Sequence, residues 1–311
     1  MRLVIIILIF CSCSVSSIFC QKPEVFAKDI ISTGMYETHP AFSPSGDTVY
    51  FLRCIPDMSV CTIYSSIKKN NSWSMPGVVS FSGQYQDVDP FVTKDGNTFY
   101  FASNRPAKKG DSIRQDWDVW KVNKVNGHWG EPVHLDSPIN TMGNEYFPTI
   151  ADNGNLYFGS SRDGGKGGAD IYVSKLIDGK YSSTENLGDS INTKGNEYEP
   201  YISPDESFMI FMATPDRIGN ADFYVSYNRN GKWTKAAKLD VVNSATTDWG
   251  GKMSRDGKYF YFGSTRTNID QTVPSLPQKE NTDQFNKRLN EPGNSLGDIY
   301  FIKTSDLQLQ K

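Results

Sequence analysis

Short apolar runs and tight polar turns alternate along most of this chain. The runs at 49–52, 99–101 and 260–262 combine β-branched and aromatic residues and are apolar at successive positions. Such runs indicate short strands that are buried on both faces. The composition agrees, because 26 glycines and 13% aromatic residues fit many short strands joined by tight turns. The pattern therefore predicts an all-β chain.

The alternation is organised as a repeat of about fifty residues. Each unit has two strands joined by a Gly- or Asp-containing turn, which supplies the positive φ that a hairpin needs. A third strand follows, and then a fourth that an aromatic residue opens. The five units begin near Glu37, Asp87, Glu145, Glu197 and Asp248, and the aromatic residues are Trp73, Trp129, Tyr181 and Trp233.

The fifth unit lacks a fourth strand of its own. A spare segment near the start of the chain, 23–31, resembles the fourth-strand segment 233–242. Pairing this segment with the last unit closes a ring and removes an exposed sheet edge. The sequence thus predicts, over residues 21–311, a single five-bladed β-propeller of four-stranded antiparallel blades, with the last blade closed by the N-terminal strand.

The repeat resembles the WD40-like (PD40) repeat of TolB-type exported bacterial proteins. The segments that carry the resemblance are EPYISPD at 199–205, FGSSR at 158–162 and DIYVS at 170–174, and the pattern covers most of residues 37–304. The resemblance implies a propeller that serves as an extracytoplasmic binding scaffold. TolB itself resembles a six-bladed ring with a helical N-terminal domain, and this sequence shows neither feature.

Residues 1–20 predict a signal peptide. Arg2 precedes an apolar run at 3–10, and small residues follow at 12–17. The run is shorter than the roughly 20 residues of a membrane-spanning helix, so no transmembrane segment is expected. Cleavage after Cys20 is one interpretation, and a lipoprotein signal with lipid on Cys13 is the other. Either predicts export to the periplasm, the cell surface or the medium.

Charge and cysteine content narrow the possible partners. The net charge of −3 comes without a run of basic residues, which excludes a nucleic-acid partner.

Two cysteines lie outside the leader, Cys54 and Cys61, on either side of a predicted hairpin turn. They predict a disulfide in an oxidising compartment, with two free thiols as the alternative. Their spacing does not suit zinc, and we expect no metal, no cofactor and a monomer.

Strand direction predicts that the irregular loops gather on one rim of the propeller. The segments 106–116, 163–169 and 267–297 all join second strands to third strands, whereas tight Asp-Gly and Asn-Gly turns occupy the opposite rim. Binding residues usually lie on long loops of a rigid scaffold. The insertion 267–297 is polar and lacks a strand pattern, so it is either a disordered surface loop or a flap over the channel mouth.

Two series of residues on the loop-rich rim are candidates for ligand binding. The acidic residues that open the units either face a ligand or hold the blade together by pairing with arginines at the ends of second strands, Arg53, Arg105, Arg162 and Arg266. The position two residues later varies, and alternation along a strand points it to the same side. Residues that a blade requires should repeat, whereas residues that a ligand requires need not. The candidates are His39, Asp89, Glu199 and Trp249, followed by Glu37, Asp87, Glu145, Glu197 and Asp248.

Most catalytic patterns are absent from the sequence. It has three histidines and neither an HExxH nor a GxSxG motif. The main hypothesis is therefore a non-catalytic propeller that binds a protein or a glycan on the loop-rich rim. The alternative is a five-bladed glycoside hydrolase, in which Asp89 and Glu199 would be the two carboxylates that flank the scissile bond.

Overall fold

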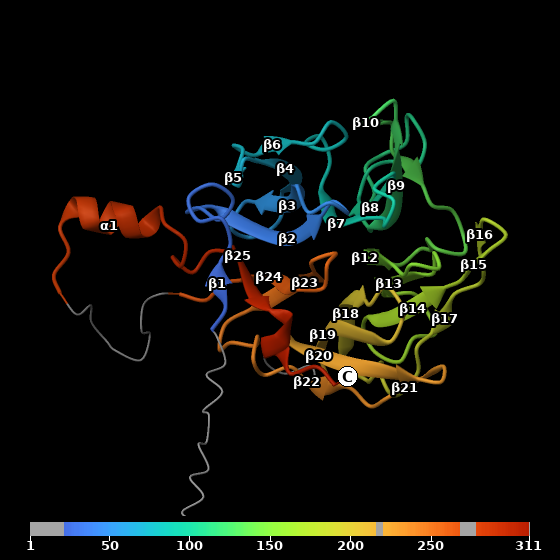
Figure 1. Ribbon diagram of the computed structural model, residues 1–311. Helices are drawn as coiled ribbons and strands as arrows, with labels where there is room; N and C mark the ends of the chain where they lie inside the picture. Colours follow the sequence, from blue (N-terminus) through green and yellow to red (C-terminus); the bar gives the residue numbers. More distant parts are fainter. Residues whose placement is uncertain (1–21, 216–219, 268–277, 311) are drawn as a thin grey trace, which may run out of the picture.

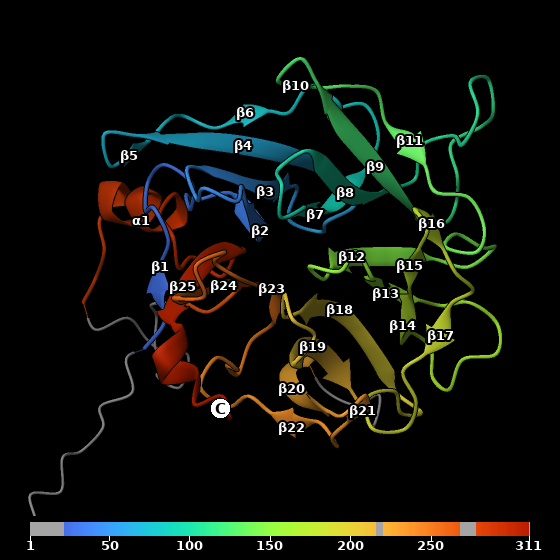
Figure 2. The ribbon, with the colours of Figure 1, turned by 45° about the vertical axis from the view of Figure 1, so that its right-hand side comes forward.

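The computed structural model describes residues 22–215, 220–267 and 278–310. The predicted signal peptide and its alternative sites at Cys13 and Cys20 lie outside these ranges. Five antiparallel sheets stand around a central axis (Figure 1, Figure 2). The predicted all-β fold, a five-bladed propeller of four-stranded blades, is confirmed.

The innermost strand of each blade follows the repeat. Neighbouring innermost strands contact one another all the way round, including the last with the first, so the ring is closed. They are β2 (Tyr36–Phe42), β7 (Asp87–Val92), β12 (Glu145–Ile150), β18 (Asn196–Ile202) and β23 (Asp248–Met253).

The second and third strands of each blade are the most apolar. The second strands are β3 (Thr48–Cys54), β8 (Thr98–Ser103), β13 (Leu156–Ser160), β19 (Phe208–Thr214) and β24 (Tyr259–Ser264). The third strands are β4 (Cys61–Lys69), β9 (Asp118–Val125), β14 (Asp170–Ser174), β20 (Asp222–Arg229) and β25 (Asp298–Lys303). Their aromatic side chains pack between adjacent sheets, and Phe51, Phe101, Phe158, Phe211 and Phe262 are almost fully buried.

The outer edge of each blade is broken into short pieces. The aromatic residues expected to open fourth strands lie in short hairpin strands, and the outermost ladder partner follows a few residues later. The hairpin strands are β5 (Ser72–Trp73), β10 (His128–Trp129), β15 (Leu176–Ile177), β16 (Lys180–Tyr181) and β21 (Lys232–Trp233). The outermost strands are β6 (Gly77–Val78), β11 (Val133–His134), β17 (Glu185–Asn186), β22 (Ala237–Lys238) and β1 (Glu24–Val25).

The N-terminal strand completes the last blade. Glu24 and Val25 of β1 pair antiparallel with Phe301 and Tyr300 of β25. Phe26 then packs edge-on against Phe42, Trp73, Tyr261 and Phe301, which belong to the first and last blades. This aromatic cluster joins the first blade to the last.

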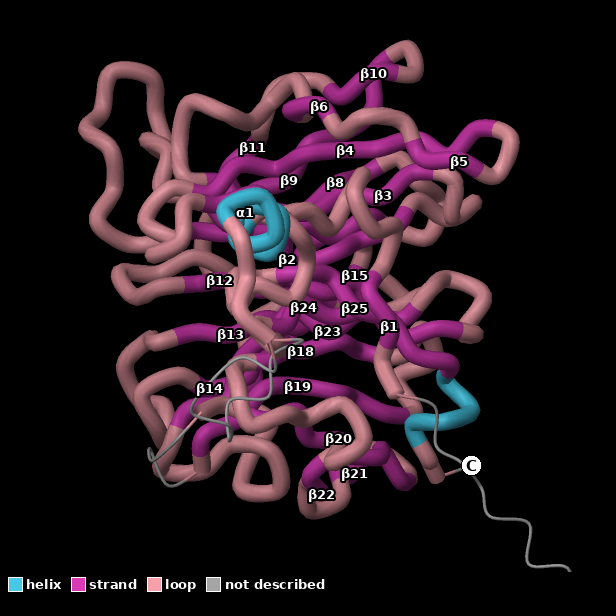
Figure 3. Tube along the Cα trace, turned by 90° about the vertical axis from the view of Figure 1, so that its left-hand side faces the viewer, coloured by secondary structure: helices cyan, strands magenta, loops and turns pink. Residues whose placement is uncertain are grey.

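The insertion in the last blade carries the one α-helix of the described residues. Helix α1 (Thr282–Leu289) begins with a capping box between Asn281 and Gln284, and none of its residues is buried. Figure 1 shows α1 to one side of the sheets, and in Figure 3, viewed from that side, it lies in front of the stacked strands. A short 3₁₀ turn, η1 (Thr304–Leu307), follows β25. In the described part of the chain, no helix is long and apolar enough to cross a membrane.

Phe26→Ala is expected to destabilise the propeller strongly. The ring of Phe26 is 8% exposed and contacts aromatic side chains of two blades, and such truncations cost about 3–5 kcal/mol. Chemical denaturation should show the loss, and hydrogen exchange should show faster exchange of β25. Phe285→Ala in α1, where the ring is 46% exposed, is the matched control. Equal stability of the two variants would contradict closure by this cluster.

Candidate functional site

A cavity of about 960 Å³ lies at the loop-rich end of the axis, and all five blades contribute to its wall. Its volume is in the range of ligand-binding cavities, about 300–1,000 Å³. Six aromatic side chains line it, and two of them, Tyr36 and Trp249, stack with ring centroids 5.8 Å apart. The six are Tyr36, Trp117, Tyr146, Phe147, Tyr198 and Trp249.

A β-bulge in every innermost strand shapes the floor of this cavity. In β2 the pairing of Thr38 with Leu52 is followed by the pairing of Ala41 with Tyr50. Residues 39 and 40 of β2 therefore lie opposite the single residue 51 of β3, which defines a β-bulge. The same shift occurs in the other four innermost strands. The first bulged residue has a positive φ each time: 50° at His39, 59° at Asp89, 55° at Phe147, 54° at Glu199 and 65° at Gly250.

The bulge corrects one expectation from the sequence. Simple alternation predicts that the acidic residue and the residue two positions later share one side of the strand. The left-handed backbone breaks that alternation, so Asp87 is bound within its own blade by Ser103 and Arg105, while Asp89 lines the axial cavity. The two series therefore occupy different environments.

Two bulge carboxylates link one blade to the next. Asp89 Oδ2 accepts a hydrogen bond of 3.0 Å from the backbone N–H of Phe147, and Glu199 Oε2 accepts one from the backbone N–H of Gly250. Gly250 itself has no room for a side chain, because a Cβ would lie 2.9 Å from the Cα of His39. One oxygen of each carboxylate, Asp89 Oδ1 and Glu199 Oε1, remains directed at His39.

His39 lies between these two carboxylates. Its Nε2 is 3.7 Å from Asp89 Oδ1 and 3.4 Å from Glu199 Oε1, and its ring stacks with Phe147 at a centroid distance of 5.7 Å. Neither imidazole nitrogen has a hydrogen-bond partner among the described residues. The side chains of His39, Asp89 and Glu199 are 7%, 4% and 7% exposed. The floor is thus polar, mostly buried and not fully hydrogen-bonded.

A buried amine lies in the same region. Lys252 Nζ is 3.4 Å from the carbonyl oxygen of Pro200. Burial lowers the pKa of Lys252 to about 8, although Asp89 and Glu199 favour its charged form. Burial also raises the pKa of Asp89 to about 7, which His39 opposes and Glu199 reinforces. Two groups of opposite type therefore titrate close to neutral pH.

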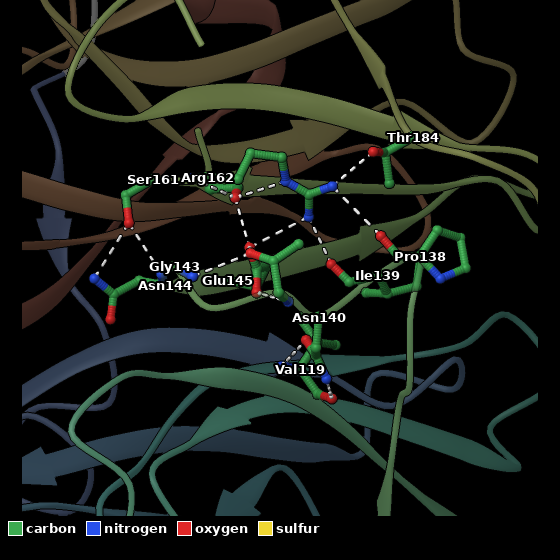
Figure 4. Close-up of polar contacts among 12 residues, drawn as sticks. Val119, Pro138, Ile139, Asn140, Gly143, Asn144, Glu145, Ser161, Arg162 and Thr184 are labelled. Atoms are coloured by element: carbon green, nitrogen blue, oxygen red, sulfur yellow. Dashed lines mark hydrogen bonds and ion pairs between the residues drawn. The ribbon is translucent and has the colours of Figure 1, made fainter. Parts of the chain in front are cut away.

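The acidic residues that open the units are bound within their own blades. Glu145 accepts hydrogen bonds from the backbone N–H and hydroxyl of Thr141 and from Ser160, and it pairs with Arg162 (Figure 4). Equivalent contacts hold Glu37 to Arg53, Asp87 to Arg105 and Asp248 to Arg266, while Glu197 binds Thr193. All five are at most 1% exposed. These contacts favour the structural interpretation of the acidic series.

Two repeated hydrogen-bonding groups were not singled out in the sequence. A hydroxyl stands four residues before the acid in four units and five before it in the other: Thr33, Ser82, Thr141, Thr193 and Ser244. The preceding asparagine in three units, Asn140, Asn192 or Asn243, binds the backbone N–H and C=O of the third strand. The recurring Asn-Thr or Asn-Ser pair before the acid was the signal for both.

Lys252 was also missed. The corresponding positions in the other units hold Ala41, Phe91, Thr149 and Tyr201, so a lysine at a mostly uncharged, buried position was the available signal. The same comparison between units had selected His39, Asp89 and Glu199.

Loops complete the mouth of the cavity. A disulfide joins Cys54 to Cys61, and the loop between them contributes Pro56 and Met58 to the cavity wall. The insertion in the last blade contributes Ser295 and Leu296. In the described ranges, no three His, Cys, Asp or Glu side chains form a group that could hold a metal ion.

The other end of the axis is narrow. A cavity of only about 50 Å³ lies there, with Lys252 and Arg255 on its wall. Asp152 binds Lys94 and Arg255 at 2.6 Å each, so ion pairs connect the second, third and fifth blades at this rim. The large cavity is therefore the one suited to a ligand.

Comparisons with known proteins identify the fold only. No family model matches the chain, and no curated protein matches it in sequence.

Solved structures share the fold at low sequence identity. An α-L-arabinofuranosidase from Lactobacillus brevis aligns with a TM-score of 0.52 and 11% identity, over 89% of this chain and 92% of that one. A puromycin-hydrolysing peptidase of Mycobacterium tuberculosis aligns with a TM-score of 0.44 and 12% identity, over 74% of this chain. This chain spans about a third of the peptidase, 34%. At these identities the likeness concerns the propeller alone.

Glu145→Gln is expected to lower the free energy of unfolding by about 2–4 kcal/mol. The amide has one acceptor oxygen, whereas the carboxylate binds Thr141, Ser160 and Arg162. Urea denaturation should measure the loss. Glu131→Gln makes the same chemical change at an exposed position and should unfold as the native protein does. If Glu145→Gln did so too, Glu145 would not be structural.

Asp89→Asn is expected to stabilise the protein at pH 8 and to change little at pH 4. A carboxyl with a pKa of about 7 when folded and about 4 when unfolded binds more protons in the folded state between these values. The stability of the native protein therefore falls as pH rises through this window, and an uncharged amide avoids the loss, which is about 1–4 kcal/mol. Thermal unfolding at both pH values measures it. A difference independent of pH would contradict the buried charge.

Proposed function

We propose that this protein is an exported, non-catalytic propeller that binds a glycan in the axial cavity. The observation that carries the proposal is the combination of aromatic walls with a polar floor of His39, Asp89 and Glu199, in which neither imidazole nitrogen of His39 has a hydrogen-bond partner among the described residues. Recognition sites of this kind bury the apolar parts of a ligand and fix its orientation through a few polar contacts.

The chemistry of a sugar suits both parts of the cavity. The C–H faces of a sugar ring pack on aromatic rings such as Tyr198 and Trp249, and its hydroxyl groups can donate to carboxylate oxygens and to an imidazole nitrogen. The free oxygens of Asp89 and Glu199 face the axis, so a chain end that enters along the axis would meet them. A concave cavity of about 960 Å³ suits such a chain end better than it suits a flat protein surface.

Backbone geometry adds support for a binding role. Non-glycine residues with positive φ are uncommon and store strain, and such strain gathers at functional sites. The bulge recurs in every blade, so its backbone belongs to the fold. The residue at this position differs from blade to blade, so the same backbone lets the ring carry a specific set of polar groups.

Glycoside hydrolysis is the second candidate, because the floor holds two carboxylates. Since His39 Nε2 is 3.7 Å from one and 3.4 Å from the other, their facing oxygens are at most about 7 Å apart, which is compatible with hydrolase separations. The imidazole of His39, however, occupies the space in which a scissile bond would have to lie. We therefore favour binding.

The proposal also covers the location of the protein and the family to which it is related. The leader-like residues 1–20 support a periplasmic, surface or secreted location, and the repeat motifs support kinship with WD40-like propellers of the TolB type. The disulfide between Cys54 and Cys61 agrees with an oxidising compartment.

A glycan panel tests the function. We expect the mature chain, residues 21–311, to bind one class among neutral, acidic and amino oligosaccharides, as measured by calorimetry. Glu199→Gln should weaken that binding by about tenfold or more, because it replaces a charged acceptor on the floor. Glu131→Gln, the same change at an exposed site, should bind as the native protein does.

Other outcomes decide against the proposal. Binding to no member of the panel, or equal binding by Glu199→Gln and the native protein, would refute a glycan site on this floor. Release of free sugar from the bound oligosaccharide, abolished by Glu199→Gln, would establish the hydrolase instead.

A further inference from the structure

The floor of the axial cavity concentrates several titratable groups in one layer. His39 comes from β2, Asp89 from β7 and Glu199 from β18, and one imidazole nitrogen lies within 3.7 Å of both carboxylates. Lys252 of β23 approaches from the narrow side of the axis, where its Nζ contacts the carbonyl of Pro200. Four of the five blades therefore contribute an ionisable group.

The remaining charged and titratable groups around this layer are tyrosines, bound acids and Arg255, which lies beside Lys252 on the narrow side and pairs with Asp152. Tyr36, Tyr146 and Tyr198 line the cavity above it, and burial raises the pKa of each, so their hydroxyls stay neutral near pH 7. The acids that open the five innermost strands, Glu37, Asp87, Glu145, Glu197 and Asp248, bind hydroxyl groups in their own blades. The tyrosines and these acids thus leave the four floor groups as the ones free to respond.

Charge balance in this layer limits how many groups can be ionised together. Asp89 and Glu199 share two basic partners, the ammonium group of Lys252 and the imidazole of His39, which is cationic only when protonated. A second negative charge there lacks a fixed cationic partner and is costly. The raised pKa of Asp89 and the lowered pKa of Lys252 are consistent with this crowding.

We propose that ligand binding in the axial cavity is coupled to uptake of a proton by this layer, with Asp89 as the group that receives it. The inference rests on the glycan-binding function proposed above. A ligand that covers the floor removes the water that reaches the Asp89 carboxyl and so favours its neutral form. The protonated carboxyl can donate a hydrogen bond to a ligand oxygen while its other oxygen keeps the N–H of Phe147.

The sign of the effect follows from this coupling. A site that takes up a proton on binding holds its ligand more tightly at low pH, and the affinity falls as pH rises through the pKa of Asp89, about 7. Binding should therefore be strongest below pH 6 and weakest above pH 8.

Calorimetry measures the coupling directly. The probe is the oligosaccharide that binds most tightly in the panel above, titrated into the mature chain at pH 7 in two buffers with different ionisation enthalpies. We expect uptake of about half a proton per site, and an affinity about three- to tenfold lower at pH 8 than at pH 6. Asp89→Asn should show no proton uptake, and its affinity should not depend on pH over this range.

A second variant keeps the test decisive if Asp89→Asn does not fold. Lys252→Met removes the positive charge that favours the ionised form of Asp89, so the midpoint of the pH dependence should move to higher pH. Lys258→Met, whose side chain is 72% exposed on the turn-rich rim, is the matched control and should leave the midpoint unchanged.

The ligand-free protein gives an independent readout. The chain has only three histidines, so the Cε1–H signal of His39 can be identified by its loss in His39→Gln. Its chemical shift should respond to the charge on the adjacent Asp89 carboxyl, with a contribution centred near pH 7 that Asp89→Asn removes. Binding without proton uptake, or proton release, would overturn this inference alone. Failure of the whole panel would overturn the binding function and the inference with it.

Discussion

The architecture depends on one buried carboxylate at the start of each innermost strand. In the third blade Glu145 connects the loop before β12, through Thr141, to the end of β13, through Ser160 and Arg162 (Figure 4). A charge buried to this degree is tolerable only when hydrogen bonds and a cation surround it. Four blades meet that requirement with an arginine of their own, while in the fourth blade Glu197 is held by the backbone N–H and hydroxyl of Thr193. Each acid thus fixes the loop geometry of its own blade on the side where the cavity opens.

That local rigidity is what allows the next two residues to deviate. Once the strand start is held by the acid, the bulge can turn one side chain per blade toward the axis without loosening the sheet. The innermost strands thus separate two tasks along three consecutive positions. The acid stabilises the blade, and the bulged residue presents chemistry to the cavity. In two blades the bulged carboxylate also accepts an N–H from the next blade, which ties the floor into the ring.

The sequence predicted the blade number from the five repeat units and the strand order from the pattern within each unit. It predicted the closure by the first strand from the spare N-terminal segment. It also selected His39, Asp89 and Glu199 by their variation between repeats. The bulge was not predictable in this way, since its left-handed φ occurs at a histidine, an aspartate, a phenylalanine and a glutamate, and only in the fifth blade at a glycine, Gly250. Helix α1 was missed because a single polar helix without a buried face leaves no apolar period to detect. Lys252 was overlooked because the comparison between units ended at the bulged residue, two positions before it.

The pairing of β1 with β25 has a consequence for how this protein is made. The strand that finishes the last blade is the first to be synthesised after the leader-like segment, and its partner, Asp298–Lys303, is almost the last. While the strands between them are synthesised, β1 has no partner in its own blade. The ring can close only after all five blades have been synthesised, so chaperones that shield open sheet edges would act on the propeller late.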